Sequence, residues 1–124
     1  MEKMEKILLV NYLADLVQRR KQCLEAAAYE VICATSFSEV MRLIEEHEFK
    51  VVVLGHGVPE AERTRIARRI KQVSPATKLV MLYLASIKNA ELADAIIHTT
   101  TDPADLARTI KDLTREQARR MSGT

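Results

Sequence analysis

The apolar residues of this chain follow two alternating patterns. Short runs rich in branched side chains predict five buried strands, at residues 7–10, 30–34, 51–54, 79–82 and 95–98. Apolar residues at helical spacing predict helices at residues 14–28, 38–48, 60–73 and 88–94, and a last helix from Pro103 onward. Apolar runs without polar alternation are typical of a parallel sheet covered on both faces. The pattern therefore predicts an α/β fold, a three-layer α/β/α doubly wound domain with a five-stranded parallel sheet.

Capping residues and apolar stripes refine the predicted helices. Ser38 is a candidate N-cap for the second helix, and Asp102 followed by Pro103 is a well-defined start signal for the last one. The residues predicted to face the core share helical spacing: Val40, Met41 and Ile44; Ile66, Ile70 and Val73; Leu106, Ile110 and Leu113. Because the sequence contains no linker or repeat, we expect a single domain over residues 1–124, with a frayed tail at about 116–124.

Composition narrows the class of protein only slightly. The 124 residues are 48% hydrophobic and 29% charged, and the net charge of +2 is too small to imply binding to nucleic acid or to an anionic membrane. Cys23 and Cys33 lie in apolar segments, which favours buried free thiols. No apolar run reaches the length of a membrane span or of a secretory signal. We therefore expect a cytoplasmic protein without a nucleic-acid or membrane partner.

Polar residues follow the predicted strands at the rim of the sheet, where ligands of doubly wound domains bind. They are Asn11 and Tyr12; Gly55, His56 and Gly57; Tyr83; and His98, Thr99 and Thr100. Because the rim contains no carboxylate and no lysine, we expect it to be neutral and to need no ion. Tyr12 and Tyr83 are placed to flank the rim and to fill it by packing.

Four segments carry a resemblance to a known family. ILLVNYLADL, FKVVVLGHGVP, TKLVMLYLAS and ADAIIHTTTDPADL are similar to the first, third, fourth and fifth strands of a response-regulator receiver domain, together with the loops that follow them. This chemotaxis-regulator-like family is flavodoxin-like, with the strand order 2-1-3-4-5, and the resemblance covers nearly the whole chain. It implies a role in two-component signal transduction.

The resemblance also assigns the functional positions of the family. The aspartate that accepts a phosphoryl group falls on Gly55, and the acidic pair that holds magnesium falls on Asn11 and Tyr12. The switch hydroxyl falls on Tyr83, and the lysine that pairs with the phosphoryl group falls on Thr99. Glycine has no side chain to carry an acyl phosphate, and an amide and a phenol offer Mg²⁺ no ionised oxygen. The expected protein is a degenerate receiver: a stand-alone pseudo-receiver that is not an enzyme, uses no cofactor and signals by protein–protein contact.

His56 and His98 are the remaining candidates for chemistry at the rim. His56 directly follows Gly55 and lies between glycines, which favours an exposed loop imidazole. Atypical phosphorylation of His56, or a role as a general base, stays open, although no acid stands nearby in sequence to orient it. The fourth strand separates the two histidines by about 10 Å of backbone. Because no further ligand completes a set, we expect no metal site.

A small-molecule-binding flavodoxin-like domain is an alternative from another functional class. Flavin phosphate needs a loop rich in Ser, Thr or Gly after the first strand, and cobalamin needs an Asp-x-His-x-x-Gly loop there. The sequence after the first predicted strand, NYLADL, fits neither requirement. The protein-contact role is therefore favoured.

The surface on which members of the family pair and dock corresponds here to about residues 88–119. Lys88, Arg108, Lys111 and Arg115 are its candidate contact residues. Small residues, threonines and mixed charges fit a polar interface, either in a homodimer with two-fold symmetry or with a kinase or another regulator. The basic helix at residues 60–73 is the other candidate surface, although the outer face of a helix is usually just solvated.

Overall fold

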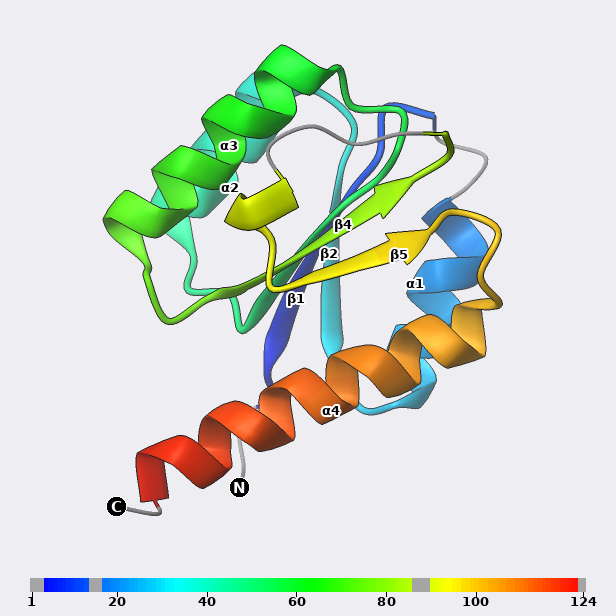
Figure 1. Cartoon of the computed structure of the whole chain (residues 1–124), viewed down its shortest axis with the longest axis vertical. Helices are drawn as coiled ribbons and strands as arrows, with labels where there is room; N and C mark the ends of the chain where they lie inside the picture. The colour runs from blue at the N-terminus through cyan, green and yellow to red at the C-terminus, as the bar shows by residue number, and fades with distance from the viewer. Residues whose placement is uncertain (1–3, 14–16, 86–89, 123–124) are drawn as a thin grey trace.

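A five-stranded parallel sheet forms the centre of the molecule (Figure 1). The structure, a computed structural model, describes residues 4–13, 17–85 and 90–122, with side chains as far as residue 115. The strands are β1 (Lys6–Val10), β2 (Glu30–Ala34), β3 (Val51–Leu54), β4 (Lys78–Tyr83) and β5 (Ala95–His98). They pair in parallel in the order β2-β1-β3-β4-β5. The predicted fold class and strand order are therefore confirmed.

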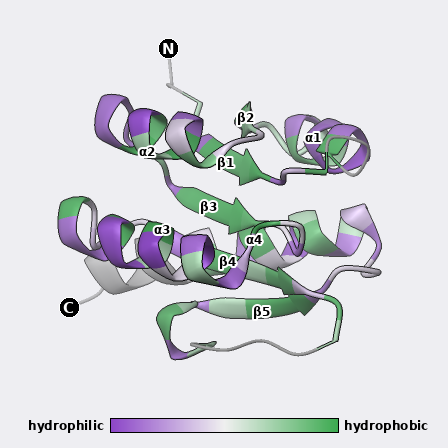
Figure 2. Cartoon of the chain, turned by 90° about the horizontal axis from the view of Figure 1, so that it is seen from above, coloured by the Kyte–Doolittle hydropathy of each residue, from purple (hydrophilic) through white to green (hydrophobic). Residues whose placement is uncertain are grey.

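Helices cover both faces of this sheet. They are α1 (Val17–Ala26), α2 (Phe37–Glu46), α3 (Glu60–Val73) and α4 (Pro103–Ser122), with a 3-10 helix, η2, at Ala90–Leu92. Figure 2 shows α2 and α3 on one side of the sheet and α1 and α4 on the other. The arrangement has the three layers that the sequence predicts.

The strands are apolar on both faces because each face packs against a pair of helices. Strand residues on the side of α2 and α3 join those helices in one core cluster, which includes Leu8, Val10, Val52, Leu54, Val40, Ile66 and Ile70. The alternate strand residues form a second cluster with α1 and α4, which includes Ile7, Leu9, Val51, Val53, Leu24, Leu106 and Ile110. Burying one such side chain stabilises the fold by about 1.5–3 kcal/mol. The two clusters therefore hold the sheet firmly and fix the rim at its carboxyl edge.

The start of α2 differs from its prediction. The N-cap is Ser36, whose Oγ accepts a hydrogen bond from the N–H of Glu39 at 3.3 Å. The prediction of Ser38 was wrong, because an N-cap needs extended backbone and Ser36 supplies it, with φ of −145°, whereas Ser38 already lies in the helix. The buried face of the helix is Val40, Leu43 and Ile44.

The range of α3 matches its prediction, but its last predicted core residue does not. Ile66 and Ile70 are buried as expected, whereas Val73 is 39% exposed. Val73 ends the helix, and the chain turns away at the C-cap Ser74. The apolar stripe of α3 therefore contributes to the core only as far as Ile70, about one turn before its last apolar residue.

Part of the helix predicted at residues 88–94 can be compared with the structure. Within the described residues 90–94 the helical element is the 3-10 helix η2, and Lys88 lies outside the described residues. Asp94 ties the end of this segment back to the sheet: its side chain accepts from the N–H of Leu79 at 2.7 Å, and its own N–H donates to Leu79 O at 2.7 Å. β5 begins at the next residue, so these hydrogen bonds end η2 and lead the chain into the strand.

The last helix begins as the sequence predicts. Asp102 Oδ1 accepts a hydrogen bond from the N–H of Ala104 at 2.8 Å, and Pro103 is the first helical residue. α4 continues to Ser122, through most of the segment that we expected to fray. No helix in the described part of the chain is long and apolar enough to cross a membrane.

Candidate functional site

The rim lies where the carboxyl ends of neighbouring strands meet. Asn11 follows β1 and Gly55 follows β3, and these two strands are adjacent in the sheet. The N–H of Gly55 donates to Val10 O at 2.7 Å, and the N–H of Asn11 donates to Ala34 O at 3.2 Å. The backbone thus continues the sheet for one residue and holds Asn11 beside Gly55.

The Asn11 side chain fills the space next to two glycines. Asn11 is fully buried, and a Cβ on Gly55 would lie 2.7 Å from its Cγ and Nδ2. A Cβ on Gly57 would lie 2.6 Å from Asn11 Oδ1 and 2.9 Å from Leu13 Cγ. The N–H of Leu13 donates to Asn11 Oδ1 at 3.1 Å and holds the amide in this place. A side chain at position 55 would therefore require Asn11 to shift, and one at position 57 would require Asn11 and Leu13 to shift.

A chain of hydrogen bonds joins three elements across the rim. Arg20 on α1 donates through Nη2 to Thr99 O at 3.1 Å and to Thr99 Oγ1 at 2.9 Å. Thr99 Oγ1 lies 2.8 Å from His56 Nδ1. Thr99 follows β5 and His56 lies just after β3, so the structure brings together two predicted rim residues and one, Arg20, that the sequence did not single out.

His56 is half-buried, so the predicted exposed imidazole was wrong. Burial lowers the pKa of His56, and the nearby charges of Arg20 and Arg63 lower it further. Its Nδ1 is occupied by Thr99, and among the described residues no carboxylate is hydrogen-bonded to the ring. Among the described residues, His56 therefore lacks the hydrogen-bonded acidic partner that orients a general base.

Two buried arginines make the rim positive, so the expectation of a neutral rim was also wrong. Arg20 is 6% exposed and Arg63 is 8% exposed, and burial lowers the pKa of Arg20. Neither forms an ion pair with a carboxylate in the part of the chain that the structure describes. The guanidinium of Arg20 reaches Thr99 from a different element.

A signal for both arginines was present in the sequence. Arg20 stands between Val17 and Leu24, at the spacing of the buried face of α1. Arg63 has the same relation to Ile66 on α3. A charged residue at an apolar position of a helical stripe points inward by geometry alone. The basic residues of the helix at 60–73 are expected to lie on a solvated face, and the burial of Arg63 corrects that expectation at this position.

The two tyrosines do not fill the rim as expected, because Asn11 already does. The Tyr12 hydroxyl donates to Glu62 Oε1 on α3 at 2.9 Å, and burial together with this hydrogen bond raises the pKa of Tyr12. Tyr83 packs edge-on against His98, with ring centroids 5.0 Å apart.

His98 is engaged apart from His56. Its Nε2 lies 3.0 Å from Leu84 O, and its Nδ1 lies 2.6 Å from Thr100 Oγ1. The two histidines therefore do not converge on a shared ligand.

The predicted contact residues on the last helix are not equivalent. Arg108 and Arg115 are exposed, and Arg108 pairs with Asp105 one turn earlier at 2.9 Å. Lys111 instead folds back: its Nζ donates to Ala27 O at 3.3 Å and lies 4.9 Å from the ring centroid of Tyr29. Lys111, a predicted contact residue, instead packs α4 against the segment that directly follows α1.

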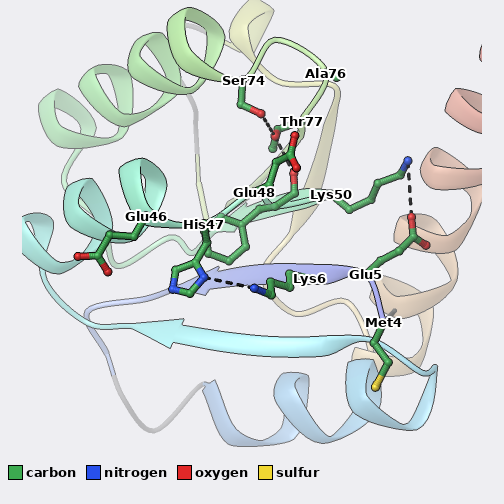
Figure 3. A pocket seen from close by; sticks show the side chains of 11 residues that line it. Met4, Glu5, Lys6, Glu46, His47, Glu48, Lys50, Ser74, Ala76 and Thr77 are labelled. Carbon is green, nitrogen blue, oxygen red and sulfur yellow. Dashed lines mark hydrogen bonds and ion pairs between the residues drawn. The ribbon is translucent and has the colours of Figure 1, made fainter. Parts of the chain in front are cut away.

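A cavity of about 530 Å³ lies at the opposite, amino-terminal edge of the sheet (Figure 3). Lys6 and Lys50 line it, but Lys6 Nζ lies 3.3 Å from His47 Nδ1 and Lys50 pairs with Glu5 at 3.5 Å. The predicted rim residues are absent from its lining. The cavity and the predicted site are therefore at separate ends of the molecule, and both lysines of the cavity are engaged by other residues of its lining.

The residues at the rim do not fit magnesium. Mg²⁺ prefers near-octahedral coordination by hard, anionic oxygens. Asn11 Oδ1 is taken by the N–H of Leu13, the Tyr12 hydroxyl points to Glu62, and Gly55 offers no side chain. Among the described residues, no group of three His, Cys, Asp or Glu side chains is placed to hold a metal ion.

The sequence matches no protein-family model and no curated protein, but solved structures match over most of the chain. A response regulator receiver domain protein (CheY-like) from Methanospirillum hungatei JF-1 is 28% identical, with a TM-score of 0.86, and the match covers 95% of this chain and 99% of that one. A response regulator receiver domain protein from Clostridium thermocellum is 24% identical, with a TM-score of 0.81, over 93% and 98% of the two chains.

A third structure adds a bound ligand to this comparison. The response regulator protein TrrA from Thermotoga maritima, in complex with Mg²⁺ and BeF, is 20% identical, with a TM-score of 0.78, over 89% of this chain and 99% of that one. With their shared strand order and layers, these likenesses establish that the chain has the CheY-like, flavodoxin-type fold of response regulator receiver domains.

Proposed function

We propose that this protein is a pseudo-receiver, which takes no phosphoryl group at the end of β3 and transmits a signal by contact with another protein. The observation that carries the proposal is the Asn11 side chain beside Gly55. By resemblance to the receiver family, position 55 is where an acceptor carboxylate would stand. A carboxylate there would need the space that Asn11 occupies, so a working acceptor would require both residues to change.

The surroundings of Gly55 support the same proposal. The positions assigned by resemblance to the acidic pair, Asn11 and Tyr12, each make a hydrogen bond within the protein. The position assigned to the lysine, Thr99, binds Arg20 and His56. None of these residues is a carboxylate that would hold magnesium for phosphoryl transfer.

The surface that we propose for contact is the β5–α4 face, defined here as Leu84, Ile96, Arg108 and Arg115. Leu84 is 57% exposed and Ile96 is 41% exposed, which is high for large apolar residues. Ile96 pairs in register with Met81, a member of the core cluster on the side of α2 and α3. Ile96 lies exposed on that side of β5, where a partner would cover it.

The charged members of the face complete the interface. Arg108 and Arg115 are exposed on α4, which packs on the opposite face of the sheet from Ile96, so they form a separate, charged part of the proposed surface. Lys111 is excluded from this face because it packs on Ala27 and Tyr29. The partner is a second copy of the chain, a kinase or another regulator.

Paired charge reversals test this proposal. We expect Arg108→Glu/Arg115→Glu to weaken self-association in sedimentation velocity, or binding to a partner recovered by cross-linking and then purified, by about tenfold, a loss of ~1.4 kcal/mol. The matched control is Arg68→Glu/Lys71→Glu, which reverses two exposed charges on α3. Equal binding by wild type and the α4 variant, or a loss confined to the α3 variant, would overturn the assignment of the β5–α4 face.

A further inference from the structure

Two hydrogen-bond donors at the rim are buried without partners. They are Asn11 Nδ2 and Arg20 Nη1, and no other unpartnered buried side-chain atom occurs among the described residues. Both residues are more than nine-tenths buried. A buried donor without an acceptor costs about 1–3 kcal/mol, and more when it is charged. Two such donors at one edge of the sheet therefore need an explanation beyond folding.

The two donors belong to one connected group of residues. Arg20 binds Thr99 through its other terminal nitrogen, and Thr99 binds His56. His56 directly follows Gly55, and Gly55 touches Asn11. The guanidinium and the amide thus stand at the two ends of a continuous chain of contacts across the carboxyl ends of β1, β3 and β5.

The positive charge of the two buried arginines indicates which class of ligand these rim residues would bind. Arg20 lies one hydrogen-bonded residue, Thr99, away from His56, and the charges of Arg20 and Arg63 lower the pKa of His56 after the larger effect of burial. No carboxylate among the described residues pairs with either one. A buried cation without a counter-charge is unfavourable, and a guanidinium fork matches the oxygens of phosphate or sulfate in particular.

We propose that this rim binds a small oxyanion of the phosphate type without forming a covalent bond, with Arg20 as its charged ligand and Asn11 and His56 beside it. Thr99 touches the guanidinium and is itself half-buried, so the site reaches the surface at Thr99 and His56. This binding does not rest on the protein-contact role proposed above, because it requires only the rim and no partner.

Thermal unfolding in phosphate tests the proposal. We expect inorganic phosphate and sulfate at millimolar concentration to raise the melting temperature of the full chain by several degrees over sodium chloride of equal ionic strength. Arg20→Met keeps a long apolar side chain, and we expect it to bind phosphate about ten- to hundredfold more weakly. The matched control is Arg19→Met, which removes the exposed neighbouring arginine on α1 and leaves the response intact.

The same measurement separates the proposal from general salt effects. Equal shifts for wild type and Arg20→Met, or equal shifts in phosphate and chloride, would mean that phosphate does not bind through Arg20. A covalent phosphoryl group would be visible in the mass of the denatured protein, whereas the bound ion proposed here is lost on denaturation. Failure of this site and failure of the pseudo-receiver proposal are therefore distinguishable.

A second readout uses the wild type alone, in case Arg20→Met does not fold. In a phosphate titration followed by ¹H–¹⁵N NMR, the proposal predicts shift changes at Asn11, Gly55, His56 and Thr99. The lysine-lined cavity at the opposite edge is the alternative phosphate-binding site in the same molecule (Figure 3). Changes confined to Lys6 and its neighbours there, or no localised changes at all, would overturn the proposal.

Discussion

Asn11 and Gly55 depend on each other for their positions. The amide of Asn11 lies 2.7 Å from the place where a Cβ of residue 55 would stand, which is too close for any side chain. Asn11 is fully buried and also held by Leu13, so it cannot simply rotate into solvent. At this end of β3, the identity of one residue therefore limits the other.

Gly55→Ala tests that dependence at the scale of a single methyl group. We expect it to lower the free energy of unfolding by about 1–3 kcal/mol, because the added Cβ would clash with the buried side chain of Asn11. In Asn11→Ala/Gly55→Ala the methyl group gains room, so the two costs do not add, and we expect a coupling of about 0.5–3 kcal/mol. Urea denaturation of the four proteins in this cycle gives the result, and simple additivity would mean that the two residues do not compete for space.

Ala28 is in a conformation that suits glycine better. Its φ is 73°, and it follows α1 in a C-terminal turn where the N–H of Tyr29 donates to Leu24 O at 3.2 Å. We expect Ala28→Gly to raise the free energy of unfolding by roughly 0.5–1 kcal/mol, since the strain relieved exceeds the entropy added to the unfolded chain. Ala26→Gly, two residues earlier at the last residue of α1, should lower it instead, since glycine has a lower helix propensity than alanine. Stabilisation by both substitutions, or by neither, would contradict the assignment of strain to Ala28.

Features of single residues could be predicted only where the type of residue and its position in the apolar pattern pointed to the same conclusion. The loss of a side chain at Gly55 is visible in the sequence because the glycine directly ends an apolar run. The role of Asn11 as the group that fills the space is not visible, since it depends on the register of β1 and β3. The buried arginines were missed for another reason: Arg20 and Arg63 were judged by their charge and not by their place in an apolar stripe.

At the scale of elements, the N-cap of α2 decides where the helix begins. Ser36 accepts a hydrogen bond from Glu39, whereas Ser38 lies inside the first turn. We expect Ser36→Ala to lower the free energy of unfolding by about 0.5–2 kcal/mol, because a free N–H at the helix start loses its acceptor. Ser38→Ala is the matched control and should change it by less than about 0.5 kcal/mol. Thermal or urea unfolding of both variants gives the comparison, and an equal loss in both would mean that Ser36 is not the functional cap.

Strands were easier to predict than helix ends for a physical reason. The four apolar residues at Val51–Leu54 are buried on both faces, so their limits coincide with the limits of the apolar run. Helix ends depend instead on which of several similar residues adopts the capping conformation, as Ser36 and Ser38 show. The short η2 was overestimated because helical spacing cannot reveal that Asp94 pulls the chain back to Leu79.

At the scale of the whole molecule, a receiver-like fold carries positive charge at its rim. The sheet and both core clusters are those of a doubly wound domain, and they are complete without any ion. The rim contributes the buried cations Arg20 and Arg63, and the described residues near them include no carboxylate set for a metal. The stability of the fold should therefore be independent of divalent cations.

Magnesium provides the corresponding prediction. We expect millimolar Mg²⁺ to leave the melting temperature unchanged, relative to NaCl of equal ionic strength. A ligand that binds only the folded state at a hundred times its Kd would add about 2.7 kcal/mol of stability, which is easily measured. A rise of several degrees that is specific to Mg²⁺ would contradict the absence of a metal site at the rim.

The most direct test of the pseudo-receiver proposal is the intact mass of the denatured protein after incubation with acetyl phosphate or phosphoramidate in the presence of Mg²⁺. We predict no gain of mass, because Gly55 offers no acceptor and Asn11 fills the space beside it. A matched phosphorylatable receiver domain in the same mixture shows that the donor is active. A stable gain of one phosphoryl group would contradict the proposal, and an acid-labile gain that disappears in His56→Ala would move the chemistry to His56.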